Sequence, residues 1–350
     1  MPTSTQVQLV RRPQGWPVPE DFRTVTVDLP DLGPDQVRVA NEFLSVDPYM
    51  RGRMNDAESY VAPFALDATM TGGAVGRVVE STSAAVPVGA AVTHDLGWRD
   101  VAQGDAARFR LVDDGVPLSA YLGVLGMTAF TAHVGLLEIA QMKPGDVVFV
   151  SGAAGAVGSM VGQIARLTGA SRVIGSAGSP EKVALVQEKY GFDAAFDYKD
   201  GHVYRQLRAA APDGIDVYFD NVGGVHLEAA LGTLNRDGRV AMCGAISGYN
   251  DEQPQPGPRN MARIIQQGLT LRGFTVGFHT QHYPAFMADM REWVTTGQIV
   301  YDETVVDGLD HAVDAFLAMM RGETTGKTVV RVGRVTSAVT SGAAGSARGA

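Results

Sequence analysis

Residues 146–167 carry the pattern that most directly indicates chemistry. They read Asp-Val-Val-Phe-Val-Ser-Gly-Ala-Ala-Gly-Ala-Val-Gly-Ser-Met-Val-Gly-Gln-Ile-Ala-Arg-Leu. The continuous apolar run at 147–150 predicts a strand buried on both faces. The amphipathic pattern at 156–167 predicts a helix. A strand, a glycine-rich turn and a helix, in this order, are the context that a dinucleotide-binding fingerprint requires.

The glycines of this turn have separate physical roles. Gly155 and Gly158 stand at the second and third positions of the fingerprint, and Ala153 stands at the first. Gly155 allows the backbone to approach a pyrophosphate, and Gly158 allows the helix to pack closely on the strand. The phosphates are expected on the free N–H groups of the helix start, which includes Ala156 and Val157. The glycine pattern alone also fits an ordinary tight turn, so the flanking strand and helix are what favour a nucleotide site.

The residues after this helix indicate which dinucleotide binds. A site for NAD usually places Asp or Glu about 20 residues beyond the glycines, to hold the ribose 2′-hydroxyl. Residues 151–180 contain no acidic side chain, and the loop at 175–179 reads Gly-Ser-Ala-Gly-Ser. Lys182 follows one turn into the next predicted helix. An uncharged loop beside an ammonium group favours a 2′-phosphate, which predicts NADP(H). The alternative for Lys182 is a solvated surface lysine.

The elements that position these residues alternate regularly along the chain. Strands are predicted at 147–150, 172–174, 194–196, 215–219, 239–243 and 269–274, and helices at 180–190, 204–210 and 225–234. This alternation predicts an α/β fold with a doubly wound parallel sheet that has helices on both faces.

The first 120 residues have a different pattern. Short strands at 37–40 and 75–79 are separated by segments rich in Pro and Gly, such as 29–34, which predicts a small β-rich domain. Strand-like pieces at 299–301 and 328–332 flank a helix at 309–321 and are expected to return to that domain. The cleft between the two domains is the expected active site.

The expected domain limits follow from this pattern. They are 1–125 plus 299–335 for the β-rich substrate domain, 126–298 for the nucleotide-binding domain, and 336–350 for a disordered tail of small and polar residues.

Composition excludes several classes of protein. The net charge of −9 argues against nucleic acid as a partner. The sequence has no long apolar span and no signal peptide, so neither a membrane helix nor secretion is expected. The single cysteine, Cys243, prevents an internal disulfide and fits a cytoplasmic protein. It also rules out a structural zinc site built from several cysteines.

Several separate blocks resemble one family, the zinc-independent medium-chain dehydrogenase/reductases of the prostaglandin reductase and curcumin reductase type. The resemblance extends from about residue 7 to residue 332, and its blocks lie at 44–54, 135–139, 152–158, 219–224, 243–250 and 326–330. It implies a Rossmann domain inserted in a GroES-like domain, and a homodimer. It also implies an NADPH-dependent alkenal/enone reductase that saturates the carbon–carbon double bond of α,β-unsaturated ketones and aldehydes.

The resemblance also assigns the site residues. Tyr49 and Tyr60 match residues that face the substrate, and Lys182 and Tyr198 match those that hold the 2′-phosphate. Tyr49 and Tyr249 are expected to hydrogen-bond the substrate as its enolate forms. The cofactor-binding matches nearer the nicotinamide are Asn221, Cys243, Gly244, Ala245, Ile246, Ser247, Tyr249, Phe274, Val276 and Phe278. The chain departs from the animal prostaglandin reductases at Gln266 and Thr324, so substrate specificity cannot be transferred from that branch.

No catalytic metal is expected. Relatives that bind zinc have a cysteine ligand where this chain has Leu44, and a His-Glu pair where it has Gly73 and Ala74. His279 and His282 have the spacing His-x-x-His, but no further ligand lies near them in the sequence, so polar residues on a cleft loop are the simpler interpretation.

The expected chemistry needs no strong acid. An alcohol dehydrogenase must move a proton on oxygen with zinc or a tyrosine–lysine pair, and the sequence contains no Tyr-x-x-x-Lys. Reduction of an enone needs only orientation of the two reactants and hydrogen-bond donors for the developing enolate. Two alternatives stay open at this point, a quinone reductase on the same scaffold and a non-catalytic NADPH-binding protein.

Overall fold

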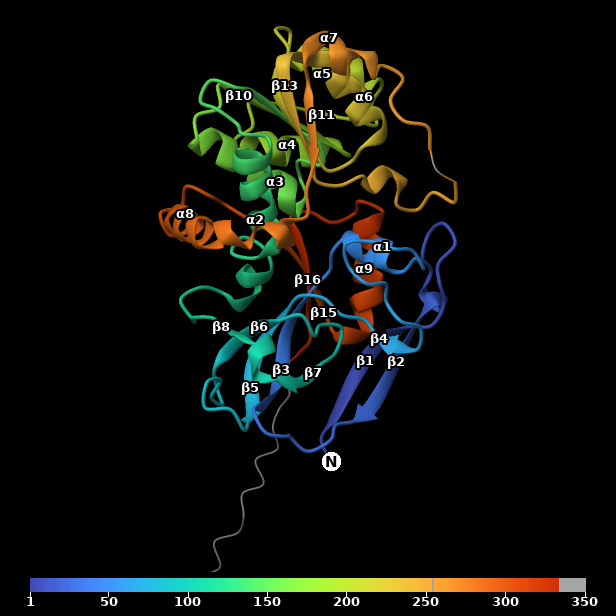
Figure 1. Ribbon diagram of the computed structural model, residues 1–350, viewed down its shortest axis with the longest axis vertical. Coiled ribbons are helices and arrows are strands. Elements are labelled where there is room, and N and C mark those ends of the chain that lie inside the picture. Colours follow the sequence, from blue (N-terminus) through green and yellow to red (C-terminus); the bar gives the residue numbers. More distant parts are fainter. Residues whose placement is uncertain (254, 334–350) are drawn as a thin grey trace, which may run out of the picture.

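The structure is a computed structural model that describes residues 1–253 and 255–333, and it has two parts built on different sheets (Figure 1). The part at the top of Figure 1 contains a six-stranded parallel sheet with the strand order β11-β10-β9-β12-β13-β14. Its strands are β9 Val147–Val150, β10 Arg172–Ala177, β11 Ala194–Asp197, β12 Ile215–Asp220, β13 Leu234–Met242 and β14 Thr270–Gly273. The order reverses between β9 and β12, as in a doubly wound Rossmann sheet.

Helices cover both faces of this parallel sheet. They are α2 Met127–Val134, α3 Ala156–Leu167, α4 Pro180–Glu188, α5 Val203–Ala210, α6 Gly224–Thr233, α7 Ala262–Gln267 and α8 Tyr283–Thr295. Alternate residues of β9 pack into different cores: Val148 and Val150 face the cluster with α2, α3 and α8, while Phe149 faces the cluster with α5 and α6. All three residues are fully buried, which confirms the predicted strand with two covered faces.

The other part is made of two mainly antiparallel sheets, in which the last two strands of the chain pair parallel (Figure 1). A seven-stranded sheet has the order β15-β16-β3-β5-β6-β8, with β7 also paired to β3, and a three-stranded sheet has the order β2-β1-β4. The strands are β1 Thr3–Leu9, β2 Phe22–Asp28, β3 Gln36–Ser45, β4 Ala68–Thr69, β5 Ala74–Ser81, β6 Ala91–His94, β7 Val101–Asp105, β8 Arg110–Leu111, β15 Glu303–Asp307 and β16 Lys327–Arg331. The helices of this part are α1 Tyr49–Arg53 and α9 Ala312–Met320.

The end of the chain returns to the sheet that its beginning forms. Strand β16 pairs antiparallel with β3, with Val329 opposite Ser45. One predicted strand is wrong, however: residues 299–301 are not in a strand, and β15 starts at Glu303. The reason is a contact between distant segments, because the Gln163 side chain of α3 hydrogen-bonds both backbone groups of Val300, at 2.9 Å each. The tail predicted at 336–350 lies outside the described residues.

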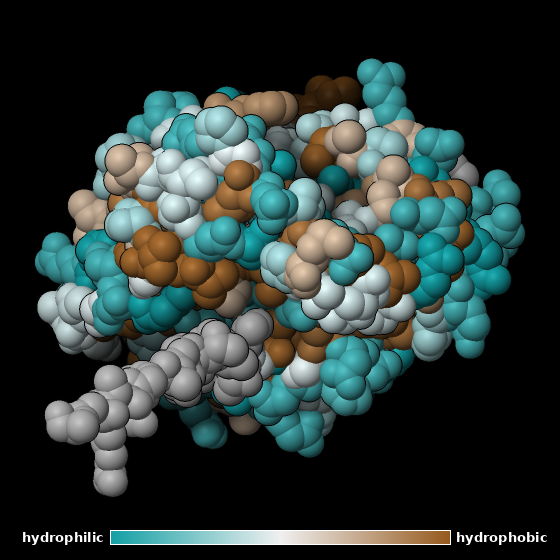
Figure 2. Space-filling model, turned by 90° about the horizontal axis from the view of Figure 1, so that it is seen from below, coloured by the Kyte–Doolittle hydropathy of each residue, from teal (hydrophilic) through white to brown (hydrophobic). Residues whose placement is uncertain are grey.

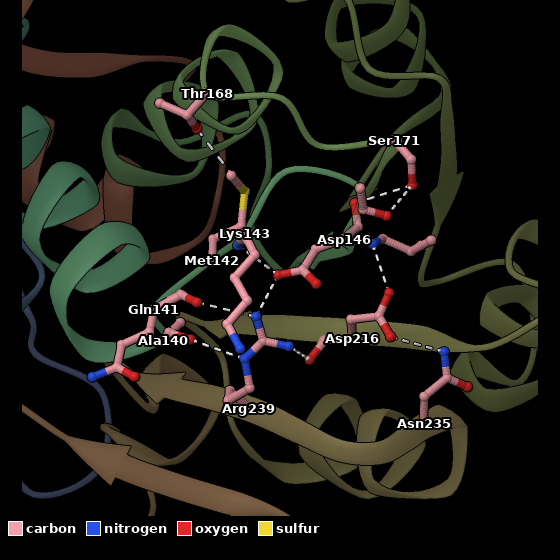
Figure 3. A network of polar contacts seen from close by, with 12 residues as sticks. Ala140, Gln141, Met142, Lys143, Asp146, Thr168, Ser171, Asp216, Asn235 and Arg239 are labelled. Carbon is pink, nitrogen blue, oxygen red and sulfur yellow. Dashed lines mark hydrogen bonds and ion pairs between the residues drawn. The ribbon is translucent and has the colours of Figure 1, made fainter.

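Polar side chains tie the parallel strands together at their amino-terminal end (Figure 3). Arg239 of β13 donates to the carbonyl oxygens of Ala140 and Gln141, at 3.2 and 3.1 Å, and pairs with Asp146 just before β9. Asp216 of β12 accepts from the Val147 N–H at 2.9 Å. These contacts fix the strand starts, at the end of the sheet opposite to the carboxyl ends where open α/β sheets bind their ligands.

The face of the molecule drawn in Figure 2 is ordinary for a globular protein. Seen from below, hydrophobic side chains lie in small groups among polar ones (Figure 2). Among the described residues, every helix is too short or too polar to cross a bilayer.

Candidate active site

The glycine turn after β9 has the close contacts that its sequence predicts. Gly152 has a φ of +62°, a conformation that side chains disfavour. A Cβ atom on Gly158 would lie 2.3 Å from the Gly152 carbonyl oxygen, so only glycine fits where α3 meets the turn. Gly155 is the N-cap residue of α3, and Ala156 and Val157 form its first turn. Their N–H groups are those that a helix leaves without internal partners, so the turn fits a pyrophosphate.

Two lysines and a tyrosine meet at the carboxyl end of β10 and β11. The Lys182 ammonium donates to the carbonyl oxygens of Gly322 and Thr324, at 2.6 Å each. A Cβ atom on Gly178 would lie 3.0 Å from the Tyr198 ring, so the tyrosine lies against the predicted 2′-phosphate loop. Burial, and then the charge of Lys199, lower the pKa of Lys182.

Lys199 was not predicted from the sequence. Its ammonium lies 5.8 Å from the Tyr198 ring centroid. Its position directly after Tyr198 could have indicated from the sequence that it lies near the 2′-phosphate. Two ammonium groups that repel each other suit a doubly charged phosphate placed between them.

The segment after β13 is fastened to the end of β12. The N–H of Cys243 donates to the Asp220 carbonyl at 2.9 Å, and those of Ile246 and Ser247 donate to Asn221 and Val222, at 3.3 and 3.1 Å. The Asn221 amide donates to the Ser151 carbonyl at the end of β9, at 2.8 Å. These bonds place residues 243–247 beside the switch point of the sheet, where a nicotinamide ring is expected.

Asp220 is a buried carboxylate that the sequence analysis did not single out. Its Oδ1 accepts hydrogen bonds from the Tyr218 hydroxyl at 2.6 Å and from the N–H groups of Gly223 and Val222, at 2.7 and 3.0 Å. Burial raises the pKa of this carboxyl group. These hydrogen bonds to Asp220 fix the turn that follows β12.

The Phe274–Phe278 loop has a mixed environment. The half-buried Phe274 ring packs edge-on against Phe219, with the ring centroids 6.4 Å apart. Val276 is partly buried against the same core cluster, whereas Phe278 is 73% exposed. Among the three residues predicted to cover the nicotinamide, Phe278 is therefore the one whose side chain is free to move onto a ligand.

Tyr49 lies in a cavity of about 230 Å³ in the antiparallel part. Ser45, Asp47, Gly73, Ala74 and other residues share its lining. Leu44, at the position of a zinc-ligating cysteine in metal-dependent relatives, is fully buried. Neither Leu44 nor Gly73 nor Ala74 has a side-chain atom that can ligate a metal, and the described residues contain no group of three His, Cys, Asp or Glu able to hold one.

The three predicted tyrosines converge from the two parts of the molecule. Tyr49 and Tyr249 pack against the same apolar cluster. A hydrogen bond also links helix α1, which begins at Tyr49, to the residue after Tyr249. In it the Arg51 Nε donates to the Asn250 side chain at 2.9 Å. Tyr60 is 59% exposed and lies within electrostatic range of Tyr49 and Tyr249.

The tyrosine hydroxyls stay protonated over the usual pH range. Burial is the largest cause that raises the pKa of each of Tyr49, Tyr60 and Tyr249 above its ordinary value. Tyr249 also accepts a hydrogen bond from the Ala245 N–H at 3.3 Å. Each phenol is therefore available as a hydrogen-bond donor at neutral pH.

Arg53 supports two of these tyrosines and was missed in the sequence, where it is one arginine among several. Its guanidinium lies beside Tyr49 and Tyr60 and is 4.0 Å from the Phe64 ring centroid. Its Nε donates to the Ala62 carbonyl at 3.0 Å. This contact fastens the loop that carries Tyr60 to helix α1.

Cys243 is expected to be an unreactive thiol. Burial, and then the charge of Asp220, raise the pKa of Cys243 to about 12. Only the thiolate is strongly nucleophilic, and an ordinary cysteine has a pKa of about 8.5, so at pH 8 a disulfide reagent should label the native protein at least about 100-fold more slowly than the unfolded protein. Absorbance of the released thiol measures this rate, and Cys243 is the single cysteine of the chain. Equal rates in the native and unfolded states would contradict this environment.

The combination of a doubly wound parallel sheet with an antiparallel domain formed by both ends of the chain defines the medium-chain dehydrogenase/reductase class. Residues 5–112 match the family described as the N-terminal domain of oxidoreductase, and residues 156–292 match the family described as zinc-binding dehydrogenase. The second match does not include Leu44, Gly73 or Ala74, where metal-dependent relatives have their ligands.

Comparison with individual proteins places the chain in a smaller family within this class. The chain is 41% identical to the NADPH-dependent curcumin reductase of Escherichia coli, over 93% of this chain and 95% of that one. It is 40% identical to the 2-alkenal reductase (NADP(+)-dependent) of Nicotiana tabacum, over 95% and 98% of the two chains. The structure of CurA from Vibrio vulnificus in complex with NADPH superposes with a TM-score of 0.90 at 40% identity and covers 94% of this chain and 99% of that one.

The chain belongs to the zinc-independent curcumin reductase and prostaglandin reductase family of medium-chain dehydrogenase/reductases. It is an NADP-dependent oxidoreductase, which confirms the cofactor predicted from the uncharged loop and Lys182.

Proposed function

We propose that the protein reduces the carbon–carbon double bond of α,β-unsaturated ketones and aldehydes. The observation that supports this most is the convergence of Tyr49, Tyr60 and Tyr249, of which Tyr49 lines a cavity at the place of the zinc site in metal-dependent relatives. The site offers neutral hydrogen-bond donors and no strong acid. Such a site suits an enolate, whose oxygen needs donors but whose carbon can be protonated by water.

The residues that we propose for NADPH form a continuous track along the carboxyl end of the sheet. The glycine turn with Gly155 and Gly158 would hold the pyrophosphate, Lys182 and Tyr198 the 2′-phosphate, and Asn221 with residues 243–247 the nicotinamide end. When bound, NADPH supplies the hydride that adds to the β-carbon of the substrate. The close packing at Gly158 fits the pyrophosphate of NADPH, and the absence of an acidic residue at 151–180 fits its 2′-phosphate.

The protein side chains would contribute orientation and charge stabilisation. The hydroxyls of Tyr49 and Tyr249 would donate to the substrate carbonyl oxygen as it gains negative charge. Arg53 behind Tyr49 and Tyr60 adds a positive charge near the same oxygen and strengthens both phenols as donors. The enolate then takes a proton at its α-carbon from water, which the open cavity admits.

A panel of an enone, an enal and a quinone, followed by NADPH absorbance and product analysis, tests this function. Tyr49→Phe and Tyr249→Phe should each lower turnover of the enone about three- to thirtyfold, because each removes one donor among several from the oxyanion. Tyr204→Phe, at an exposed position of α5, is the matched control and should leave turnover unchanged. Rapid quinone reduction without enone reduction would favour the quinone reductase, and NADPH binding without any oxidation would favour a non-catalytic protein.

A further inference from the structure

A buried ion pair joins the last strand of the chain to the loop that carries Tyr49. The Lys327 Nζ, at the start of β16, lies 2.8 Å from the Asp47 Oδ1, and the two side chains are 4% and 3% exposed. Among the ion pairs of residues 1–253 and 255–333, this is the one in which both partners are buried. Strand β16 lies at the junction of the two parts of the molecule (Figure 1). A buried pair at this junction can fix one part against the other.

Asp47 is bonded to the start of helix α1 through both its side chain and its backbone. Its Oδ2 accepts a hydrogen bond from the Ser45 hydroxyl, and its carbonyl oxygen accepts one from the Met50 N–H at 3.2 Å. Ser45, Asp47 and Tyr49 line the same cavity. The charge of Asp47 also contributes, after burial, to raising the pKa of Tyr49, so the two groups lie within electrostatic range. A displacement of Asp47 would therefore displace the turn that orients Tyr49.

Lys327 and its neighbour hold this turn from behind. Besides Asp47, the Lys327 ammonium binds the Val46 carbonyl oxygen, to which it donates at 2.8 Å. The Thr328 carbonyl oxygen accepts from the Val46 N–H at 3.2 Å. The cavity is lined by Asp47 and not by Lys327, so the ammonium supports the cavity wall without reaching a substrate.

The residue before Lys327 contacts the glycine turn for which we propose the pyrophosphate. The Gly326 N–H donates to the Ala154 carbonyl at 2.9 Å, and Gly326 forms an isolated β-bridge with Gly155. Gly326 has a φ of +63°, and a Cβ atom on it would clash with the Asp302 carbonyl oxygen, so only glycine fits. Consecutive Cα atoms are about 3.8 Å apart. Two adjacent residues of one segment therefore hold the glycine turn and the Tyr49 loop.

Stability alone does not account for an ion pair at this position. Burial of two charges costs solvation free energy that their attraction only roughly offsets, so an apolar pair of similar volume is often equally stable. An ammonium and a carboxylate differ from such a pair in their directionality, because the hydrogen bond fixes the distance and angle between the two segments that carry them. The pair is therefore suited to alignment.

We propose that Lys327 is a positioning residue that acts through Tyr49. It fixes the Tyr49 hydroxyl relative to the glycine turn, so that the hydroxyl and the cofactor meet the same substrate in the correct orientation. This proposal rests on the proposed function, in which the Tyr49 hydroxyl stabilises the enolate. Transfer between two bound reactants depends on such alignment. Because a misplaced hydroxyl loses the same hydrogen bond as a missing one, loss of the ion pair should resemble Tyr49→Phe.

A double-mutant cycle on turnover of an α,β-unsaturated ketone with NADPH tests the proposal. Lys327→Met alone would leave the Asp47 carboxylate buried and unpaired, which can prevent folding. The pair variant, Asp47→Asn/Lys327→Met, leaves neither partner charged and keeps the shape of the Asp47 side chain. It should lower kcat about three- to thirtyfold, as Tyr49→Phe does, and leave the KM for NADPH within about twofold. Added to Tyr49→Phe, it should lower kcat by less than a further factor of about two.

Two controls separate positioning from other effects. Asp47→Asn alone keeps the ammonium, which can still donate to the Asn oxygen and to Val46, and should retain part of the turnover. Arg331→Met breaks the exposed ion pair of the same strand with Asp307 and should change neither kcat nor the KM for NADPH. Bound NADPH per chain, measured by fluorescence, corrects the kcat of each variant for its folded fraction.

Three results would overturn the proposal while enone reduction stands. One is a pair variant whose kcat stays within about twofold of wild type, and another is a pair of losses that multiply when the pair variant and Tyr49→Phe are combined. The third is a KM for NADPH that rises as kcat falls, which would make the ion pair a general support of the glycine turn. If the wild-type protein reduces no enone, the proposed function itself fails and the proposal fails with it.

Discussion

Replacing Lys182 by alanine should raise the KM for NADPH roughly ten- to a hundredfold and leave the KM for NADH within about twofold. The magnitude follows from the loss of one charge-assisted hydrogen bond to the 2′-phosphate, about 1.5–3 kcal/mol. The same reasoning predicts that the wild-type protein prefers NADPH to NADH at least about tenfold, because NADH lacks the group that Lys182 binds. Steady-state kinetics with both cofactors measures the two effects.

The present contacts of Lys182 make the comparison with NADH essential. Its ammonium holds the carbonyl oxygens of Gly322 and Thr324, so its loss also releases the segment before β16. If the lysine acted only through that segment, the KM values for NADH and NADPH would rise together. A rise for NADPH alone assigns the effect to the 2′-phosphate.

Two further variants complete this test. Lys199→Ala should show the same selectivity with a smaller magnitude, because Lys199 is exposed and contributes through its charge. Lys143→Ala removes the same charge from an exposed residue in the loop before β9, at the other end of the sheet, and should change neither constant. Equal catalytic efficiency of the wild-type protein with both cofactors would contradict the assignment.

The regular part of the fold could be predicted because its residues decide it locally. The apolar run at 147–150 needs two covered faces, and Gly158 has space for no side chain. The conformation of residues 299–301 could not be predicted, because their apolar side chains fit a strand as well as they fit the irregular segment that the structure has. Its backbone is instead bonded by Gln163, far away in the sequence.

Part of the site depends on contacts between distant segments, which a single sequence does not reveal. Asp220 and Arg53 have ordinary sequence surroundings, and their roles appear only when Tyr218 and the Tyr60 loop pack against them. The predicted domain limits, homodimer and cytoplasmic location stay predictions, because one chain without a partner does not test them.

In the proposed reaction, hydride goes to the β-carbon of the substrate and not to its carbonyl carbon. The reason lies in the side chains: Leu44, Gly73 and Ala74 provide no metal ligand, and the chain has no Tyr-x-x-x-Lys pair to protonate an alkoxide. The tyrosine hydroxyls can stabilise an enolate oxygen without giving up their protons. The enolate route is therefore the easier one for these residues.

Isotope labelling tests this claim most directly. With an α,β-unsaturated ketone and NADPH that carries deuterium at the transferred position, nuclear magnetic resonance of the product should show deuterium at the β-carbon. With unlabelled NADPH in heavy water, the deuterium should appear at the α-carbon. An allylic alcohol as the main product, with the label on the carbonyl carbon, would contradict the account.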